Sequence, residues 1–148
     1  MEAGPFHRPA SFGRRAVAAL IDYGVFFALF YAYLELVGTP NDEGGLSVNG
    51  LPALPIPLGW LALFPVMEFA TGMTMGKAVL GMRVESADGE RLSVRQSLKR
   101  RAADLIDLGF YGIPAFISYR NSERKQRLGD LWAKTVVLQG RPEQAAAA

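Results

Sequence analysis

The most apolar stretch of the chain runs from Ala16 to Val37 and carries only two charges, Asp22 and Glu35. As a helix it would be about 33 Å long at about 1.5 Å per residue, enough to cross a hydrocarbon core of roughly 30 Å. A surface helix of a soluble domain would instead show a polar stripe along one side. The pattern therefore predicts a membrane-spanning helix over about 16–37.

A second apolar stretch covers residues 52–70, and its single charge, Glu68, lies near the end. Pro57 suits the first turn of a helix, and Pro65 predicts a kink because proline has no backbone N–H to donate. The residues between the two stretches, 38–51, are rich in glycine, proline and asparagine, which favours a loop. We therefore expect a second membrane helix at 52–70, joined to the first by this loop.

A third apolar stretch, 102–119, carries Asp104 and Asp107 inside it. Residues that break helices lie in its middle, at Gly109, Gly112 and Pro114. The segment is therefore not expected to be a straight span. Either it dips into the membrane and returns at this break, or it crosses completely. We favour the return, because a crossing would place the basic run 120–127 on the outer side.

The polar segments contain signs of short strands and a helix. Val79–Ser86 and Leu92–Val94 flank an Asp-Gly pair at 88–89, which predicts a β-hairpin. Ser93 is a suitable N-cap for an amphipathic helix that follows it. Near the end of the chain, Thr135–Leu138 predicts a further strand.

The distribution of lysine and arginine predicts the orientation. The leader 1–13, the segment 71–101 and the tail from 120 all carry basic residues, whereas the loop 38–51 has none. Basic segments beside membrane helices stay in the cytoplasm. We therefore expect the N-terminus to be cytoplasmic and the loop 38–51 to be external.

Length and composition agree with a small membrane protein. The chain has 148 residues, of which 50% are hydrophobic and 20% charged, and this length favours one domain. We place that domain at 14–138, with a disordered tail at 139–148. The expected fold is a mainly α membrane protein: two full transmembrane helices, a third kinked or re-entrant segment, a cytoplasmic β-hairpin and a C-terminal strand.

The residue content also narrows the possible chemistry. There is no cysteine, and the only histidine, His7, lies near the N-terminus. Disulfides, thiolate metal sites and a serine-histidine-aspartate triad are therefore not expected, and we predict no metal, no cofactor and no enzymatic activity. The net charge of +2 is explained by basic residues flanking apolar spans. The expected partner is accordingly the lipid bilayer and not nucleic acid.

Acidic residues within the apolar stretches are the candidate site. A carboxylate inside a bilayer is costly unless it is paired, protonated or facing water, so such residues are candidates for ion or proton binding. The ion- or proton-binding candidates are Asp22, Glu68, Asp104 and Asp107. The basic residues expected to partner them are Arg14, Arg15, Lys77, Arg100 and Arg101.

Three motifs, in this order and spacing, resemble the RDD family of small bacterial membrane proteins, named for an arginine and two aspartates. The first is Arg14-Arg15 followed by Ala-x-x-Leu-Ile-Asp22. The other two contain the motif residues Thr74, Gly76 and Lys77, and then Arg127, Asp130 and Thr135. The resemblance covers about residues 12–138. It implies that Asp22 is the first family aspartate and that the second is Asp130 or Asp107.

The resemblance implies a protein of the bacterial plasma (inner) membrane with a transport role, including cation/proton exchange for some members. Under this hypothesis Asp22 is the principal site, Asp107 and Glu68 assist, and a homo-oligomer is required because two or three helices cannot enclose a pathway. The alternative is an accessory or assembly subunit of a larger membrane complex. In that case the arginines and aspartates form a static ion-pair network without turnover.

Overall fold

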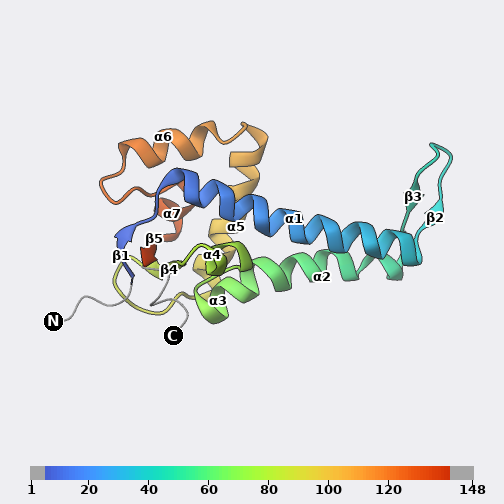
Figure 1. Ribbon diagram of the computed structural model, residues 1–148, viewed down its shortest axis with the longest axis horizontal. Helices are drawn as coiled ribbons and strands as arrows, with labels where there is room; N and C mark the ends of the chain where they lie inside the picture. The colour runs from blue at the N-terminus through green and yellow to red at the C-terminus, as the bar shows by residue number, and fades with distance from the viewer. Residues whose placement is uncertain (1–5, 141–148) are drawn as a thin grey trace.

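The computed structural model describes residues 6–140. In this part of the chain, a long helical hairpin (residues 12–71) projects from a cap (residues 6–11 and 72–140) of short helices and a small sheet (Figure 1). The cap is thus assembled from segments on both sides of the helical hairpin. The first five residues of the leader and residues 141–148 of the tail expected to be disordered lie outside the described residues.

The first arm of the helical hairpin is α1 (Phe12–Val37), which Ser11 caps by accepting a hydrogen bond from the Arg14 N–H. The second arm is a helical run over Leu51–Thr71, and the two arms lie side by side (Figure 1). It consists of η1 (Leu51–Ala53), α2 (Pro55–Leu61), η2 (Ala62–Val66) and α3 (Met67–Thr71). A two-residue ladder between β2 (Thr39–Pro40) and β3 (Leu46–Ser47) closes the connecting loop.

Both arms are long and apolar enough to cross a membrane. Only 11% and 17% of the positions in their most apolar windows are buried in the protein, whereas the core helix of a soluble protein would be mostly buried. The exposed side chains include Leu20, Phe27 and Leu58. The two predicted membrane helices are thus present as candidate spans, with apolar surfaces that lipid would cover.

Pro65 lies in η2, a π-helical turn. Such a turn places an extra residue in the helix and is a common way to accommodate an interrupted hydrogen-bond ladder. The helix therefore accommodates Pro65 in a π-helical turn, and the kink expected there stays a prediction.

The cap contains a three-stranded antiparallel sheet in the order β1 (Phe6–Pro9), β5 (Thr135–Gly140), β4 (Met82–Ser86). Val84 of β4 lies opposite Val137 of β5, and both side chains are buried. The strand predicted at 135–138 is confirmed, and of the strand predicted at 79–86 only residues 82–86 form one, because Val79 ends α4 and residues 80–81 form a turn. The predicted local β-hairpin is wrong, because residues 92–94 form no strand and β5 takes their place beside β4.

The described chain ends add to this sheet on both sides of the predicted domain 14–138. Residues 6–9 of the leader form β1, and residues 139–140, expected in the disordered tail, belong to β5. Both segments gain ladder hydrogen bonds by pairing with each other, with Phe6 opposite Gly140.

The third apolar stretch is two helices, not one. It covers the second half of α5 (Val94–Gly109) and most of α6 (Ile113–Asn121). Residues 110–112 separate these helices, and Tyr111 and Gly112 have positive φ angles of 53° and 76°. In Figure 1, α5 lies across the direction of α1, and α6 runs back from the end of α5 toward the end of the molecule where α1 begins. The predicted break is confirmed. Whether this segment enters the membrane stays a prediction.

The helical hairpin joins the cap where α1 meets α4 (Met75–Val79). A Cβ at Gly76 would lie 2.1 Å from the backbone oxygen of Ala18, so only glycine permits this approach. Arg15, Ala18 and Asp22 are the buried residues of α1, and they lie on the one face that contacts the cap. This face carries the polar residues described next.

Candidate functional site

Asp22 is buried and bound by neutral donors. Its Oδ2 accepts a hydrogen bond from the Thr74 hydroxyl at 2.6 Å, and its Oδ1 accepts one from the Gly76 backbone N–H at 2.7 Å. No arginine pairs with it among the described residues. Asp22 therefore holds α4 against α1 by capping the first turn of α4, instead of forming the expected ion pair.

Glu68, at the end of the second arm, has no exposed surface and contacts three cations. Its Oε1 accepts from Arg100 Nε at 2.8 Å, and its Oε2 accepts from Arg101 Nη2 at 2.7 Å. The Lys77 ammonium also donates to Oε2. Burial lowers the pKa of Lys77 to about 8, although the Glu68 charge opposes this shift. Glu68 thus connects the helical hairpin to both α4 and α5.

Asp130 is the second fully enclosed carboxylate and lies in the first turn of α7 (Leu128–Ala133). Its two oxygens pair with the guanidinium groups of Arg15 and Arg100, and the backbone N–H of Arg127 donates to it at 3.0 Å. Burial alone would raise the pKa of Asp130, but the nearby charges of Arg100, Arg15 and Arg127 hold it well below its usual range. Asp130 therefore joins α1, α5 and α7.

Asp104 completes a continuous chain of ion pairs. It accepts from Arg101 at 2.8 Å and from Arg127 at 3.3 Å. Because Arg100 contacts both Glu68 and Asp130, all these pairs are connected. We call the set the ion-pair network: Arg15, Glu68, Lys77, Arg100, Arg101, Asp104, Arg127 and Asp130.

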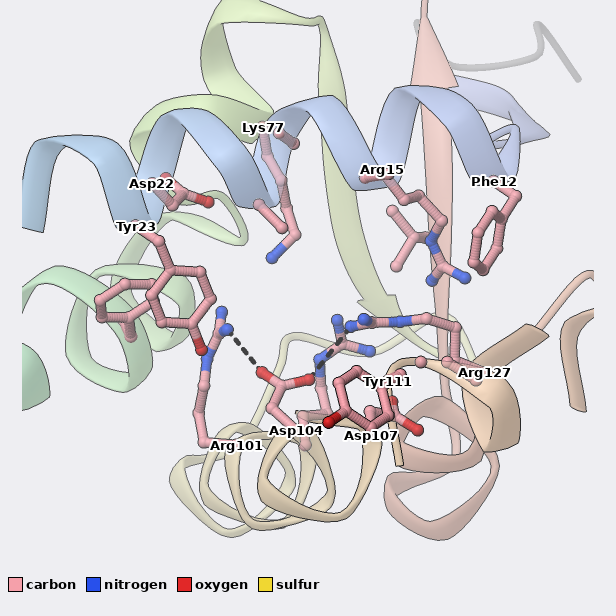
Figure 2. Close-up of a pocket in the computed structure, with 18 residues that line it drawn as sticks. Phe12, Arg15, Asp22, Tyr23, Lys77, Arg101, Asp104, Asp107, Tyr111 and Arg127 are labelled. Carbon is pink, nitrogen blue, oxygen red and sulfur yellow. Dashed lines mark hydrogen bonds and ion pairs between the residues drawn. The ribbon is translucent and has the colours of Figure 1, made fainter. Parts of the chain in front are cut away.

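The ion-pair network borders a cavity of about 340 Å³ between α1 and α5. Figure 2 shows Arg15 and Lys77 extending into this space from one side and Arg101 and Arg127 from the others. Apolar and aromatic side chains line the rest of the wall, among them Phe12, Ala16, Ala19, Tyr23, Phe64 and Ala115. The cavity is therefore cationic where the network lies and apolar elsewhere.

Asp107 also borders the cavity but lies outside the ion-pair network. Its side chain is 7% exposed, and neither carboxylate oxygen has a hydrogen-bond partner among the described residues. Burial raises its pKa, while the Arg127 charge opposes the rise. Among the described residues, Asp107 is thus a candidate acid that the ion-pair network leaves unpaired.

The structure brings together most, not all, of the residues singled out from sequence. Lys77, Arg100 and Arg101 meet Glu68, but Arg14 is exposed and forms no ion pair within the described part. The family-motif residue Thr135 is uncharged, and its hydroxyl oxygen accepts a hydrogen bond from Arg100 Nη1 at 2.9 Å. No group of three acidic or histidine residues suited to a metal is found among the described residues.

Sequence reasoning missed the pairing of Arg15 with Asp130 and of Arg127 with Asp104. A partial signal existed for the position of Asp130 alone, because Arg127 and Asp130 have the spacing of a helix N-cap and its N3 residue, and the Asp130 carboxylate accepts a hydrogen bond from the Arg127 backbone N–H at 3.0 Å. The aromatic walls, including Tyr23 and Phe64, had no such signal.

The structure combines two apolar arms long enough to cross a membrane with buried ion pairs gathered at one end of these arms, which are features of a small helical membrane protein. Residues 9–134 match the RDD family. The chain therefore belongs to the RDD family, as the motifs predicted. Searches of curated proteins and of solved structures found no match.

Replacing Asp130 with asparagine is expected to destabilise the protein by about 3–5 kcal/mol, because two buried guanidinium groups lose their counter-charge. The measurement is thermal unfolding in detergent, with Asp42→Asn in the exposed loop as the matched control.

The folded-state pKa of Asp130 is lowered, so its stabilisation is present above the ordinary aspartate pKa and lost as the pH falls below it. The difference between wild type and Asp130→Asn should therefore narrow below about pH 4. A constant difference down to pH 2, on the order of two units lower, would contradict this.

Proposed function

We propose that this RDD protein is a non-enzymatic assembly or accessory subunit of the bacterial inner membrane, with its N-terminus and cap on the cytoplasmic side. The charge distribution supports this orientation. The connecting loop at the far end of the helical hairpin has no lysine or arginine, whereas the cap holds nearly all of them.

The proposal of an assembly or accessory role rests on how the buried carboxylates are bound by neighbouring groups. Glu68 contacts three cations, Asp130 and Asp104 contact two each, and Asp22 is satisfied by two neutral donors. A carboxylate held by fixed cations or donors at this burial is a poor carrier for protons or metal cations, since releasing it leaves buried charges unpaired. The arrangement therefore favours a static structural role.

Exposed apolar surfaces support association with other chains. In the cap, Leu105 of α5, Phe110 after the end of α5 and Ile113 of α6 are each more than half exposed. These apolar side chains lie outside the two candidate spans. A surface of this kind on a folded protein is covered by lipid or by a partner. We therefore propose a homo-oligomer or a larger membrane complex.

The proposal is tested by the composition of the native particle. The protein is extracted in a mild detergent from cells that express it at its natural level, and the mass of the particle is measured by native mass spectrometry. We expect several copies of this chain, or this chain with other proteins in fixed ratio. A single copy without any partner would contradict the proposal.

A second function, cation/proton exchange, is favoured by one observation. Asp107 is buried, borders the cavity and, among the described residues, has no partner for either oxygen. Its raised pKa suits a group that takes up and releases protons nearer neutrality than an ordinary aspartate. In this version Asp107 takes the principal role that the family resemblance gives to Asp22, which remains an assisting candidate.

In vesicles containing the purified protein, exchange predicts a proton flux that depends on Na⁺, Li⁺ or K⁺. Asp107→Asn should reduce this flux on the order of ten-fold or more, because asparagine cannot release a proton. Asp42→Asn, in the external loop, is the control with the same chemical change and should behave as wild type. Wild-type vesicles without any cation-dependent flux would rule exchange out.

A further inference from the structure

The ion-pair network has more positive than negative charges. It contains five basic side chains and three carboxylates, as the seven ion pairs show. Two excess positive charges are therefore held in a largely buried region, where each needs a nearby negative charge. The cavity is the space into which several of these cations extend (Figure 2).

Two carboxylates outside the network lie close enough to be considered as counter-charges. Asp22 already accepts hydrogen bonds at both oxygens from Thr74 and Gly76. Asp107 makes no ion pair within the described part of the chain, and burial raises its pKa, so it loses its proton less readily than an ordinary aspartate. Asp104, which also lines the cavity, is occupied by Arg101 and Arg127. Asp104 is already counted within the network, so only Asp22 and Asp107 can offset the two excess positive charges. When Asp107 is protonated, Asp22 offsets one of them and one positive charge is left unbalanced.

Donors without acceptors are found at the same place. The Nε atoms of Arg101 and Arg127 are buried and have no hydrogen-bond partner within residues 6–140. Both residues line the cavity, and the Arg101 side chain is only 8% exposed. Buried guanidinium N–H groups are normally satisfied, and an anionic oxygen is their strongest acceptor. The two orphaned N–H groups therefore indicate a missing acceptor.

The rest of the cavity fits a ligand with an apolar part. Its volume, about 340 Å³, lies within the range of about 300–1,000 Å³ found for ligand pockets. The exposed residues Ala16 and Tyr111 border it. Ala16 lies in the second turn of α1, near the end that the charge distribution places at the cytoplasmic face of the membrane. The cavity is therefore positioned where the headgroup of a lipid meets its acyl chains.

We propose that this cavity binds a phosphate-bearing anion, with Arg101, Arg127 and Lys77 as its principal ligands. Two sources share this chemistry: the headgroup of an anionic phospholipid and a free phosphate. The apolar wall formed by Ala19 and Tyr23 favours the lipid. Asp107, when protonated, donates a further hydrogen bond to the anion, which distinguishes this proposal from the exchange function, where Asp107 must release its proton.

The test uses the full chain in nanodiscs of phosphatidylcholine alone or of phosphatidylcholine with phosphatidylglycerol. After transfer to detergent, native mass spectrometry measures how much lipid stays bound to each chain. In a second arm, inorganic phosphate is titrated against the protein in lipid-free detergent, and the thermal unfolding midpoint is recorded. Wild type is expected to retain phosphatidylglycerol selectively, to be stabilised by phosphate, or both.

Arg127→Gln removes one ligand and is expected to weaken binding on the order of ten-fold, as loss of a charge-assisted hydrogen bond does. Arg14→Gln is the matched control, because Arg14 is exposed on the same end of α1 and lies outside the cavity. It should bind as wild type does.

A second variant tests the cavity without changing its charge. Ala19→Phe fills the space, whereas Leu20→Phe adds a ring at a neighbouring position that is 73% exposed. We expect the first to lose binding and the second to keep it. Selective lipid retention identifies the headgroup as the source, and stabilisation by phosphate alone identifies the free anion. Absence of both in wild type, or equal binding by wild type and folded Ala19→Phe, would overturn the proposal.

Discussion

The structure depends on Arg100, whose guanidinium group contacts Glu68 at the end of the second arm and Asp130 in the first turn of α7. Arg15 of α1 reaches the same Asp130, so one carboxylate joins segments that are 115 positions apart in the sequence. Burying any one of these charged groups alone would cost free energy, and this cost is offset only when its oppositely charged partners are buried beside it. The ion-pair network therefore requires the helical hairpin and the cap to assemble together.

This constraint explains why the residues around the network are small or neutral. Gly76 allows the backbone of α4 to reach α1, and this approach places its N–H on Asp22. Thr74 supplies the second donor to Asp22 and Thr135 supplies an acceptor to Arg100, so the remaining polar atoms are also largely satisfied. Among the described residues, the unpartnered buried atoms of Asp107, Arg101 and Arg127 border the cavity, whereas the remaining one, Gln139 Oε1, belongs to β5 and does not line it. The first three are therefore the atoms on which our functional proposals rest.

The two candidate spans and the break near Gly112 could be predicted from sequence, because lipid dictates the composition of a whole window and helix breakers act locally. The strand order of the sheet could not be predicted, because the Asp-Gly turn favoured a local β-hairpin. In the structure, Leu92 packs in the core and β4 pairs with the distant β5. The pairing of Lys77 with Glu68 could be predicted in kind, because basic residues beside the apolar stretches were expected to partner the acidic residues inside them. The pairing of Arg15 with Asp130 had no local signal, since any arginine of the layer is chemically equivalent until the backbone is placed.

The most direct measurement of the central claim is a double-mutant cycle between Arg15 and Asp130. Thermal or denaturant unfolding in detergent gives the free energy of unfolding for wild type, Arg15→Met, Asp130→Asn and the double variant. If these two residues join the helical hairpin to the cap, the double variant should recover part of the loss, with a coupling energy on the order of 2–3 kcal/mol. Losses that add to within about 0.5 kcal/mol would contradict the account.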